Sequence, residues 1–243
     1  MFIMVFKGKK SKNRISRWLR KSKYEVSESS FLGKKYYTVR CAGETIPWKK
    51  IMKEFGTQLP FFLEDSDDAV PGIRTVREDG ALLERALMNS ALAHCKKNRP
   101  EKLTIVDYSG RMSSYVEPFI RYSRYVRIVT EQTDAYTSLA FRILCKTGMS
   151  LLISKDIRSS YDSAAVVIPE AINETVIYAG KTKVFCMSPD GIIAGDMTVA
   201  RRFVCPYSVM REIPDGVDKE RFLSVVYAIT KDEKLTDAEL DIA

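Results

Sequence analysis

Several residue types and patterns that define common functional classes are scarce in this chain of 243 residues. It has one histidine, His94, which excludes a metal site built from several histidines of one chain. The five cysteines include no C-x-x-C pair, so neither a zinc knuckle nor a redox dithiol is indicated. No apolar run approaches the ~20 residues that cross a bilayer, and no secretory signal pattern is present. We therefore expect a cytoplasmic protein without a metal site.

Positive charge is concentrated near the N-terminus. The formal net charge is +8, and Lys7–Lys23 holds nine lysines and arginines with no acidic residue. Because this stretch has few apolar positions, we predict that residues 1–30 form a basic, flexible arm. Such an arm suits nucleic acid or an anionic membrane surface, and a solubilising role is the alternative.

Residues 31–99 have the pattern of a small α+β unit. Strand composition occurs at Lys35–Arg40 and Leu59–Leu63, and a helix is predicted between them at Pro47–Phe55. A longer helix is predicted from Asp79 to Lys97, because its apolar residues recur on one face.

From residue 100 onward strands and helices alternate, which predicts a parallel sheet. The expected strands are Leu103–Val106, Tyr125–Thr130, Met149–Ile153, Ser163–Pro169 and Thr175–Ala179, with helices at Ser113–Tyr122 and Asp134–Lys146. Two further apolar runs, Lys183–Met187 and Ile192–Thr198, flank the turn sequence Ser188–Gly191 and predict a β-hairpin. A last helix is predicted after Asp218. We expect the hairpin and the last helix to pack on the same domain, residues 100–243.

Three segments carry a resemblance to Rossmann-like nucleotide-binding domains over about residues 100–180. They are Leu103–Val106, Val126–Glu131 and Ala164–Pro169. The resemblance implies a sheet ordered 3-2-1-4-5, with a ligand crevice beyond the carboxyl ends of strands 1 and 4. The expected fold class is therefore α/β: a Rossmann-like parallel-sheet core with a small N-terminal α+β unit and a C-terminal hairpin plus helix.

The first strand-to-helix turn, Asp107–Ser113, lacks the G-x-G-x-x-G sequence that grips a dinucleotide. The three glycine positions are taken by Asp107, Ser109 and Met112. An aspartate at the first position repels phosphate, and a methionine at the third holds the helix away from the strand. No nicotinamide cofactor is expected.

Two interpretations of the crevice remain open. In the first, an anion or nucleotide binds at the start of the helix, and the binding residues are Ser109, Gly110, Arg111, Ser113, Ser114 and, in the place of a ribose-binding acid, Glu131. In the second, Asp107 and Ser109 cap a helix and Glu131 is a solvated strand end.

The loss of the glycines favours a non-catalytic binding or scaffold protein with a degenerate crevice. One alternative is an enzyme or sensor that binds an anionic small molecule at Ser109–Ser114. Another is a binder of nucleic acid or of an anionic membrane surface through Lys7–Lys23. An unidentified protein partner is compatible with all three, and no residue is singled out as catalytic.

Two other features have both a functional and a structural interpretation. Arg121–Arg127 interleaves arginine with tyrosine, as nucleic-acid surfaces that stack bases do; alternatively, the arginines favour a helix C-terminus and the tyrosines begin a strand. His94 lies near the end of the long helix, where the helix dipole stabilises a cation, and we expect it to be structural.

Overall fold

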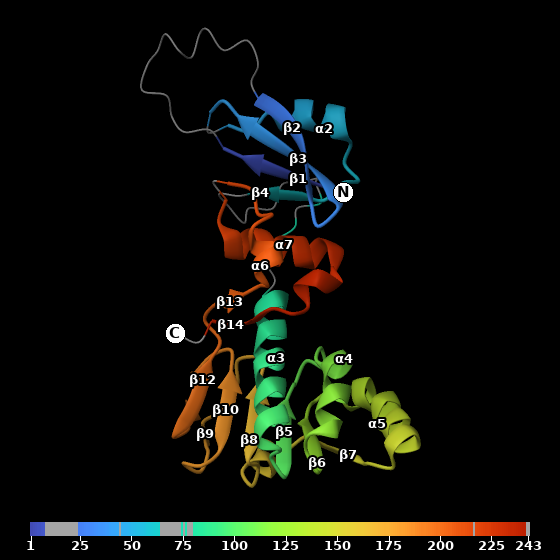
Figure 1. Cartoon of the computed structure of the whole chain (residues 1–243), viewed down its shortest axis with the longest axis vertical. Coiled ribbons are helices and arrows are strands. Elements are labelled where there is room, and N and C mark those ends of the chain that lie inside the picture. The colour runs from blue at the N-terminus through green and yellow to red at the C-terminus, as the bar shows by residue number, and fades with distance from the viewer. Residues whose placement is uncertain are drawn as a thin grey trace. The chain divides into compact units, whose positions relative to one another are not determined.

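The computed structural model describes residues 1–7, 24–43, 45–63, 74, 76, 80–215 and 217–241 (Figure 1). The chain forms two compact units: Met1–Leu82 with Cys205–Asp237, and Leu83–Val204 with Ala238–Ala243. Most of the second unit, Leu83–Val204, is thus inserted into the sequence of the first, and Ala238–Ala243 follow it. In the part of the chain that is described, no helix has the length and apolar character needed to cross a membrane.

The first unit contains a four-stranded sheet in the order β2-β3-β1-β4 (Figure 1). Its strands are β1 (Phe2–Phe6), β2 (Tyr24–Phe31), β3 (Lys34–Cys41) and β4 (Phe61–Leu63). β1 is parallel to β3 on one side and to β4 on the other, and β2 is antiparallel to β3. β1 and β2 are thus part of a sheet, which corrects the prediction that residues 1–30 are an arm. Of the basic segment Lys7–Lys23, all but Lys7 lies outside the described residues.

Side chains alternate between the two faces of this sheet, and each face packs on a helix. Ile3 and Val5 share a buried cluster with Ile51 of α2 (Trp48–Phe55). On the other face, the ring of Phe222 from α7 (Lys219–Thr230) lies 5.0 Å from that of Phe31. The last helix was correctly predicted, but it belongs to the first unit and not to a domain of residues 100–243. Shorter elements of this unit are α6 (Tyr207–Met210) and η3 (Glu233–Leu235).

The second unit contains a six-stranded, all-parallel sheet in the order β12-β10-β8-β5-β6-β7. Its strands are β5 (Lys102–Val106), β6 (Tyr125–Val129), β7 (Leu151–Ser154), β8 (Ala165–Ile168), β10 (Lys183–Cys186) and β12 (Asp196–Val199). Counted from β5 as strand 1, the order is 3-2-1-4-5-6. The α/β fold with a Rossmann-like core and a central first strand is confirmed.

The predicted hairpin of residues 183–198 is wrong. β10 and β12 are neighbours in the main sheet but run parallel, with Lys183 opposite Asp196. Residues 175–179 do not supply the fifth strand of that sheet, because β9 (Val176–Ile177) pairs instead with β11 (Ile192–Ile193) in a separate small sheet. β9 and β11 are therefore parts of crossover connections, whose buried side chains pack on Val184 and Cys186.

Helices cover the face of the parallel sheet opposite β9 and β11. They are α3 (Ala81–Asn98), α4 (Ser113–Val116), η1 (Glu117–Arg121) and α5 (Thr133–Thr147). The helix predicted over residues 113–122 is divided, because Pro118 opens a 3-10 turn. α5 ends as predicted at Gly148, which has a left-handed φ of 71°. A short antiparallel pair, β13 (Phe203–Val204) with β14 (Glu239–Leu240), completes the unit.

His94 packs on the main sheet, with its ring centroid 5.5 Å from that of Phe185 in β10. Burial lowers the pKa of His94, and the positive charge of Lys183 lowers it further, while Asp196 raises it. The expected cation stabilisation by the helix end is therefore outweighed by burial and by the neighbouring lysine.

A depressed His94 pKa predicts a stability that falls with acidity. The unfolded chain binds a proton near pH 6.5, whereas the folded chain does so only at lower pH, so the free energy of unfolding decreases as the pH falls below about 6.5. We expect His94→Gln to lose less stability than the wild type between pH 7.5 and 5.5 in urea titrations. An equal loss in both proteins would show that His94 titrates alike in the folded and unfolded chain.

Candidate functional site

The candidate crevice lies where the chain direction across the parallel sheet reverses. From β5 the chain continues to β6 on one side, whereas β8 lies on the other side of β5. In open α/β sheets, ligands bind beyond the carboxyl ends of the strands at such a reversal. The candidate site therefore comprises the turn after β5 together with the ends of β8 and β6.

The carboxylate of Asp107 organises the turn after β5. Asp107 is completely buried, and its Oδ2 accepts a hydrogen bond from the backbone N–H of Met112 at 2.9 Å. Oδ1 accepts a hydrogen bond from the hydroxyl of Ser109 at 3.0 Å. The Tyr136 hydroxyl of α5 also donates to Oδ2. One side chain thus satisfies three donors, two of them on Met112 and Tyr136, which are themselves buried.

Two further carboxylates bind the backbone amide and the guanidinium group that an anionic ligand would use. The backbone N–H of Ser109 donates to Glu170 Oε1 at 3.0 Å, and Glu170 follows β8. The Arg111 guanidinium forms an ion pair of 2.9 Å with Glu84 of α3. Its Nε also donates to the Ser109 hydroxyl at 3.1 Å. The amide and the positive charge of this turn are therefore directed at the protein's own side chains.

Gly110 allows α5 to begin close to the turn. Its φ of 75° lies in the left-handed region, which glycine adopts without strain. A Cβ atom at this position would lie 2.9 Å from Cβ of Gln132 and 3.1 Å from Cβ of Ala135. The single glycine of the turn is thus required for packing between β5 and α5.

Acidic groups surround Tyr108. Its hydroxyl donates to Glu174 Oε1 at 3.0 Å. Burial raises the pKa of Tyr108, the hydrogen bond to Glu174 raises it further, and the negative charge of Glu131 contributes in the same direction. In α5, burial and the hydrogen bond to Asp107 raise the pKa of Tyr136. Both tyrosines are therefore protonated donors at neutral pH, next to carboxylates that disfavour a second anion.

The predicted site residues occupy different surroundings. Ser109, Gly110 and Arg111 lie together in the turn, and Glu131 is exposed at the end of β6. Ser113 and Ser114 begin the four-residue helix α4, which has no side-chain cap. Ser114 lines a hollow of about 660 Å³ between residues of α3, η1 and α5. The structure thus gathers half of the predicted set at the turn.

Sequence reasoning missed the acidic partners of the turn. Glu170 stands directly after the predicted strand Ser163–Pro169, so its place at the reversal point could have identified it. Glu84 and Tyr136 lie on helices, and no sequence pattern indicates that they meet this turn. Their contacts depend on how α3 and α5 pack on the sheet.

No family model, curated protein or solved structure was found to match this chain. Among the residues that the structure describes, no group of three or more histidine, cysteine, aspartate and glutamate side chains is arranged to hold a metal ion.

Proposed function

We propose that this chain is a non-catalytic binding protein whose Rossmann-like crevice is closed by its own acidic side chains. The observation that carries the proposal is the use of the turn's amides. Ser109 N–H is bound by Glu170 and Met112 N–H by Asp107, both within 3.0 Å. A dinucleotide pyrophosphate binds through backbone amides of this turn, so here it would have to displace two carboxylates.

A retained anion site at Ser109–Ser114, in an enzyme or a sensor, is supported less well. It requires Glu170 to release the Ser109 amide and Glu84 to release Arg111. The charge of Glu131 and Glu174 near Tyr108 opposes the same ligand.

Nucleotide titrations test the closed crevice directly. We expect NAD⁺, NADP⁺, ATP and S-adenosylmethionine at 1 mM to leave the melting temperature of the wild type unchanged. A ligand with a micromolar Kd would exceed its Kd at least 100-fold and add about 2.7 kcal/mol to the free energy of unfolding. Micromolar binding of any of the four by calorimetry would contradict the proposal.

Opening the turn provides a gain-of-binding test. The double variant Glu84→Ala, Glu170→Ala frees the Arg111 guanidinium and the Ser109 amide from their carboxylates. We expect 50 mM sulfate to raise the melting temperature of this variant more than that of the wild type. The matched control is Glu174→Ala, which removes a carboxylate bound to a tyrosine hydroxyl and frees no amide. Equal responses of all three proteins would show that the acidic side chains do not close the turn.

A further inference from the structure

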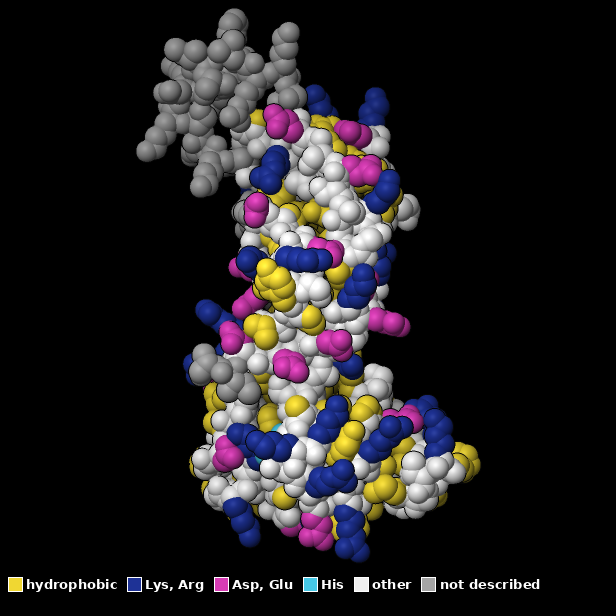
Figure 2. Space-filling model, viewed as in Figure 1, with side chains coloured by type: hydrophobic (Ala, Val, Ile, Leu, Met, Phe, Trp, Pro, Cys, Tyr) yellow, Lys and Arg dark blue, Asp and Glu magenta, His cyan; other side chains and the backbone are white. Residues whose placement is uncertain are grey.

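Exposed basic and aromatic side chains gather at the amino edge of the parallel sheet, opposite the crevice. The segment that leads from η1 into β6 carries Arg121, Tyr122, Arg124 and Tyr125. Both arginines are exposed, and 40% of the Tyr125 surface is accessible. Figure 2 shows several lysine and arginine side chains on the face of the second unit that is turned toward the viewer in Figure 1.

The end of α3 brings two more cations to the same place, Lys96 in its last turn and Arg99 directly after the helix. The Lys96 ammonium lies 5.9 Å and the Arg99 guanidinium 6.0 Å from the ring centroid of Tyr122. The Arg124 guanidinium lies 5.2 Å from the centroid of Tyr125. At these distances a cation is attracted to the face of the ring. We call the six residues the amino-edge patch: Lys96, Arg99, Arg121, Tyr122, Arg124 and Tyr125.

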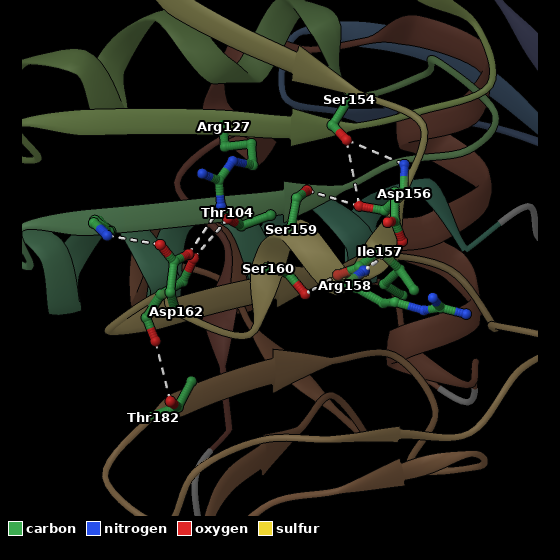
Figure 3. A network of polar contacts seen from close by, with 12 residues as sticks. Thr104, Arg127, Ser154, Asp156, Ile157, Arg158, Ser159, Ser160, Asp162 and Thr182 are labelled. Carbon is green, nitrogen blue, oxygen red and sulfur yellow. Dashed lines mark hydrogen bonds and ion pairs between the residues drawn. The ribbon is translucent and has the colours of Figure 1, made fainter.

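The cations of the amino-edge patch differ from their neighbours in how they are paired. Lys102 and Arg127 both form ion pairs with Asp162, at 2.6 and 2.9 Å, and Figure 3 shows Arg127 and Asp162 directed at each other. Among the residues that the structure describes, no carboxylate forms an ion pair with any of the four patch cations. Their positive charge is therefore available to an anionic partner.

Two hollows flank the patch, one beside each tyrosine. Tyr122, Lys96 and Arg121 line the hollow of about 660 Å³ next to α5. Tyr125 lines a second hollow of about 360 Å³ on the other side, over Thr104 and Leu152. Leu152 is 41% exposed although parallel sheets are normally covered on both faces. Each tyrosine ring thus borders a recess.

We propose that the amino-edge patch binds single-stranded nucleic acid. Tyr122 and Tyr125 stack on bases, and the four cations contact backbone phosphates, the combination that non-specific single-strand binders use. The proposal names a partner for the binding protein inferred above, but it rests on the opposite edge of the sheet. Nucleotide titrations and oligonucleotide binding can therefore fail independently of each other.

The test measures fluorescence anisotropy of labelled dT20 and U20 with the full chain, between 50 and 200 mM KCl. For four phosphate contacts to a single strand, log K should fall with log salt at a slope of about −3. In Arg121→Gln, Arg124→Gln the slope should become shallower by about 1.4, with affinity at 50 mM reduced at least tenfold. The matched control is Arg201→Gln, Arg202→Gln, which removes the same charge from exposed positions elsewhere in this unit and should change affinity less than twofold.

Stacking is tested separately from charge. Tyr125→Ala should weaken binding about tenfold at every salt concentration, without changing the slope, because it removes a ring and no cation. Circular dichroism checks that each variant is folded.

Several outcomes would overturn the proposal. These are no binding by the wild type at 50 mM KCl, equal losses in the two arginine pairs, and unchanged affinity in Tyr125→Ala. If phosphatidylserine vesicles bind as tightly as the oligonucleotides, and Tyr125→Ala does not weaken the vesicle binding, the partner is an anionic membrane surface instead. If replacing residues 8–23 abolishes oligonucleotide binding, while the Arg121→Gln, Arg124→Gln variant binds like the wild type, the activity belongs to the N-terminal basic segment.

Discussion

Replacing Asp107 by alanine is expected to lower the free energy of unfolding of the Rossmann-like unit by about 3–5 kcal/mol. The substitution leaves the Met112 amide and the Tyr136 hydroxyl without an acceptor in the interior. Each buried donor left unpaired costs ~1–3 kcal/mol, and bonds to a charged acceptor are at the strong end of the range. Urea unfolding followed by circular dichroism measures the change. Tryptophan fluorescence is unsuitable for this unit, because both tryptophans, Trp18 and Trp48, precede it in the sequence.

Two further variants serve as a control and as a test of a single hydrogen bond to Asp107. Glu131→Ala removes an exposed carboxylate at the neighbouring strand end and should change stability by less than about 0.5 kcal/mol. Tyr136→Phe removes one of the three donors to Asp107 and should cost about 1–2 kcal/mol. Because the two residues share a hydrogen bond, the loss in the Asp107, Tyr136 double variant should be smaller than the sum of the single losses. A loss below about 1 kcal/mol for Asp107→Ala would show that the turn does not depend on its carboxylate.

Truncating Ile3 to alanine is expected to destabilise the first unit by about 2–5 kcal/mol. Ile3 is completely buried in β1, between β3 and β4, and the substitution leaves a cavity in the sheet core. Deleting residues 1–7 should prevent this unit from folding, because it removes the interior strand. The fluorescence of Trp48, whose ring lies 5.8 Å from that of Phe61, reports the unfolding.

The control replaces residues 8–23 with a short glycine-serine linker. Phe6 and Glu25 are both register partners of Arg40, so the two joined ends lie two strand spacings apart, or about 10 Å. Six flexible residues span that distance. We expect the stability of the linker variant to stay within about 1 kcal/mol of the wild type. A loss as large as that of Ile3→Ala would mean that the basic segment contributes to the fold.

The elements that were predicted well depend on local sequence alone. The apolar run Leu103–Val106 and the glycine stop at Gly148 are read from neighbouring residues, and both are confirmed. The run Lys183–Met187, a turn and the run Ile192–Thr198 describe a hairpin and a crossover equally well. Which one forms depends on packing against the main sheet, where Val184 and Cys186 are buried.

The candidate site shows the same limit. The sequence identifies Ser109, Gly110 and Arg111 as the turn after the central strand, because that turn has a fixed place in the fold. Glu170 is indicated only by its position after the predicted strand Ser163–Pro169, and nothing in the sequence indicates that Glu84 approaches this turn from a helix, 25 or more residues away. Side-chain contacts over such separations follow from tertiary packing, which residue periodicity does not encode.

The split arrangement of the first unit also sets the order of events during protein synthesis. Strands β1 to β4 leave the ribosome before Leu83–Val204, and α7 follows that whole insertion. At ~5–20 residues per second, translating the insertion takes on the order of ten seconds. For that time Phe31 and Tyr36 lack Phe222, the ring that they contact in the finished protein. The nascent chain therefore presents an apolar sheet face to chaperones while the inserted unit, though encoded later, is already able to collapse.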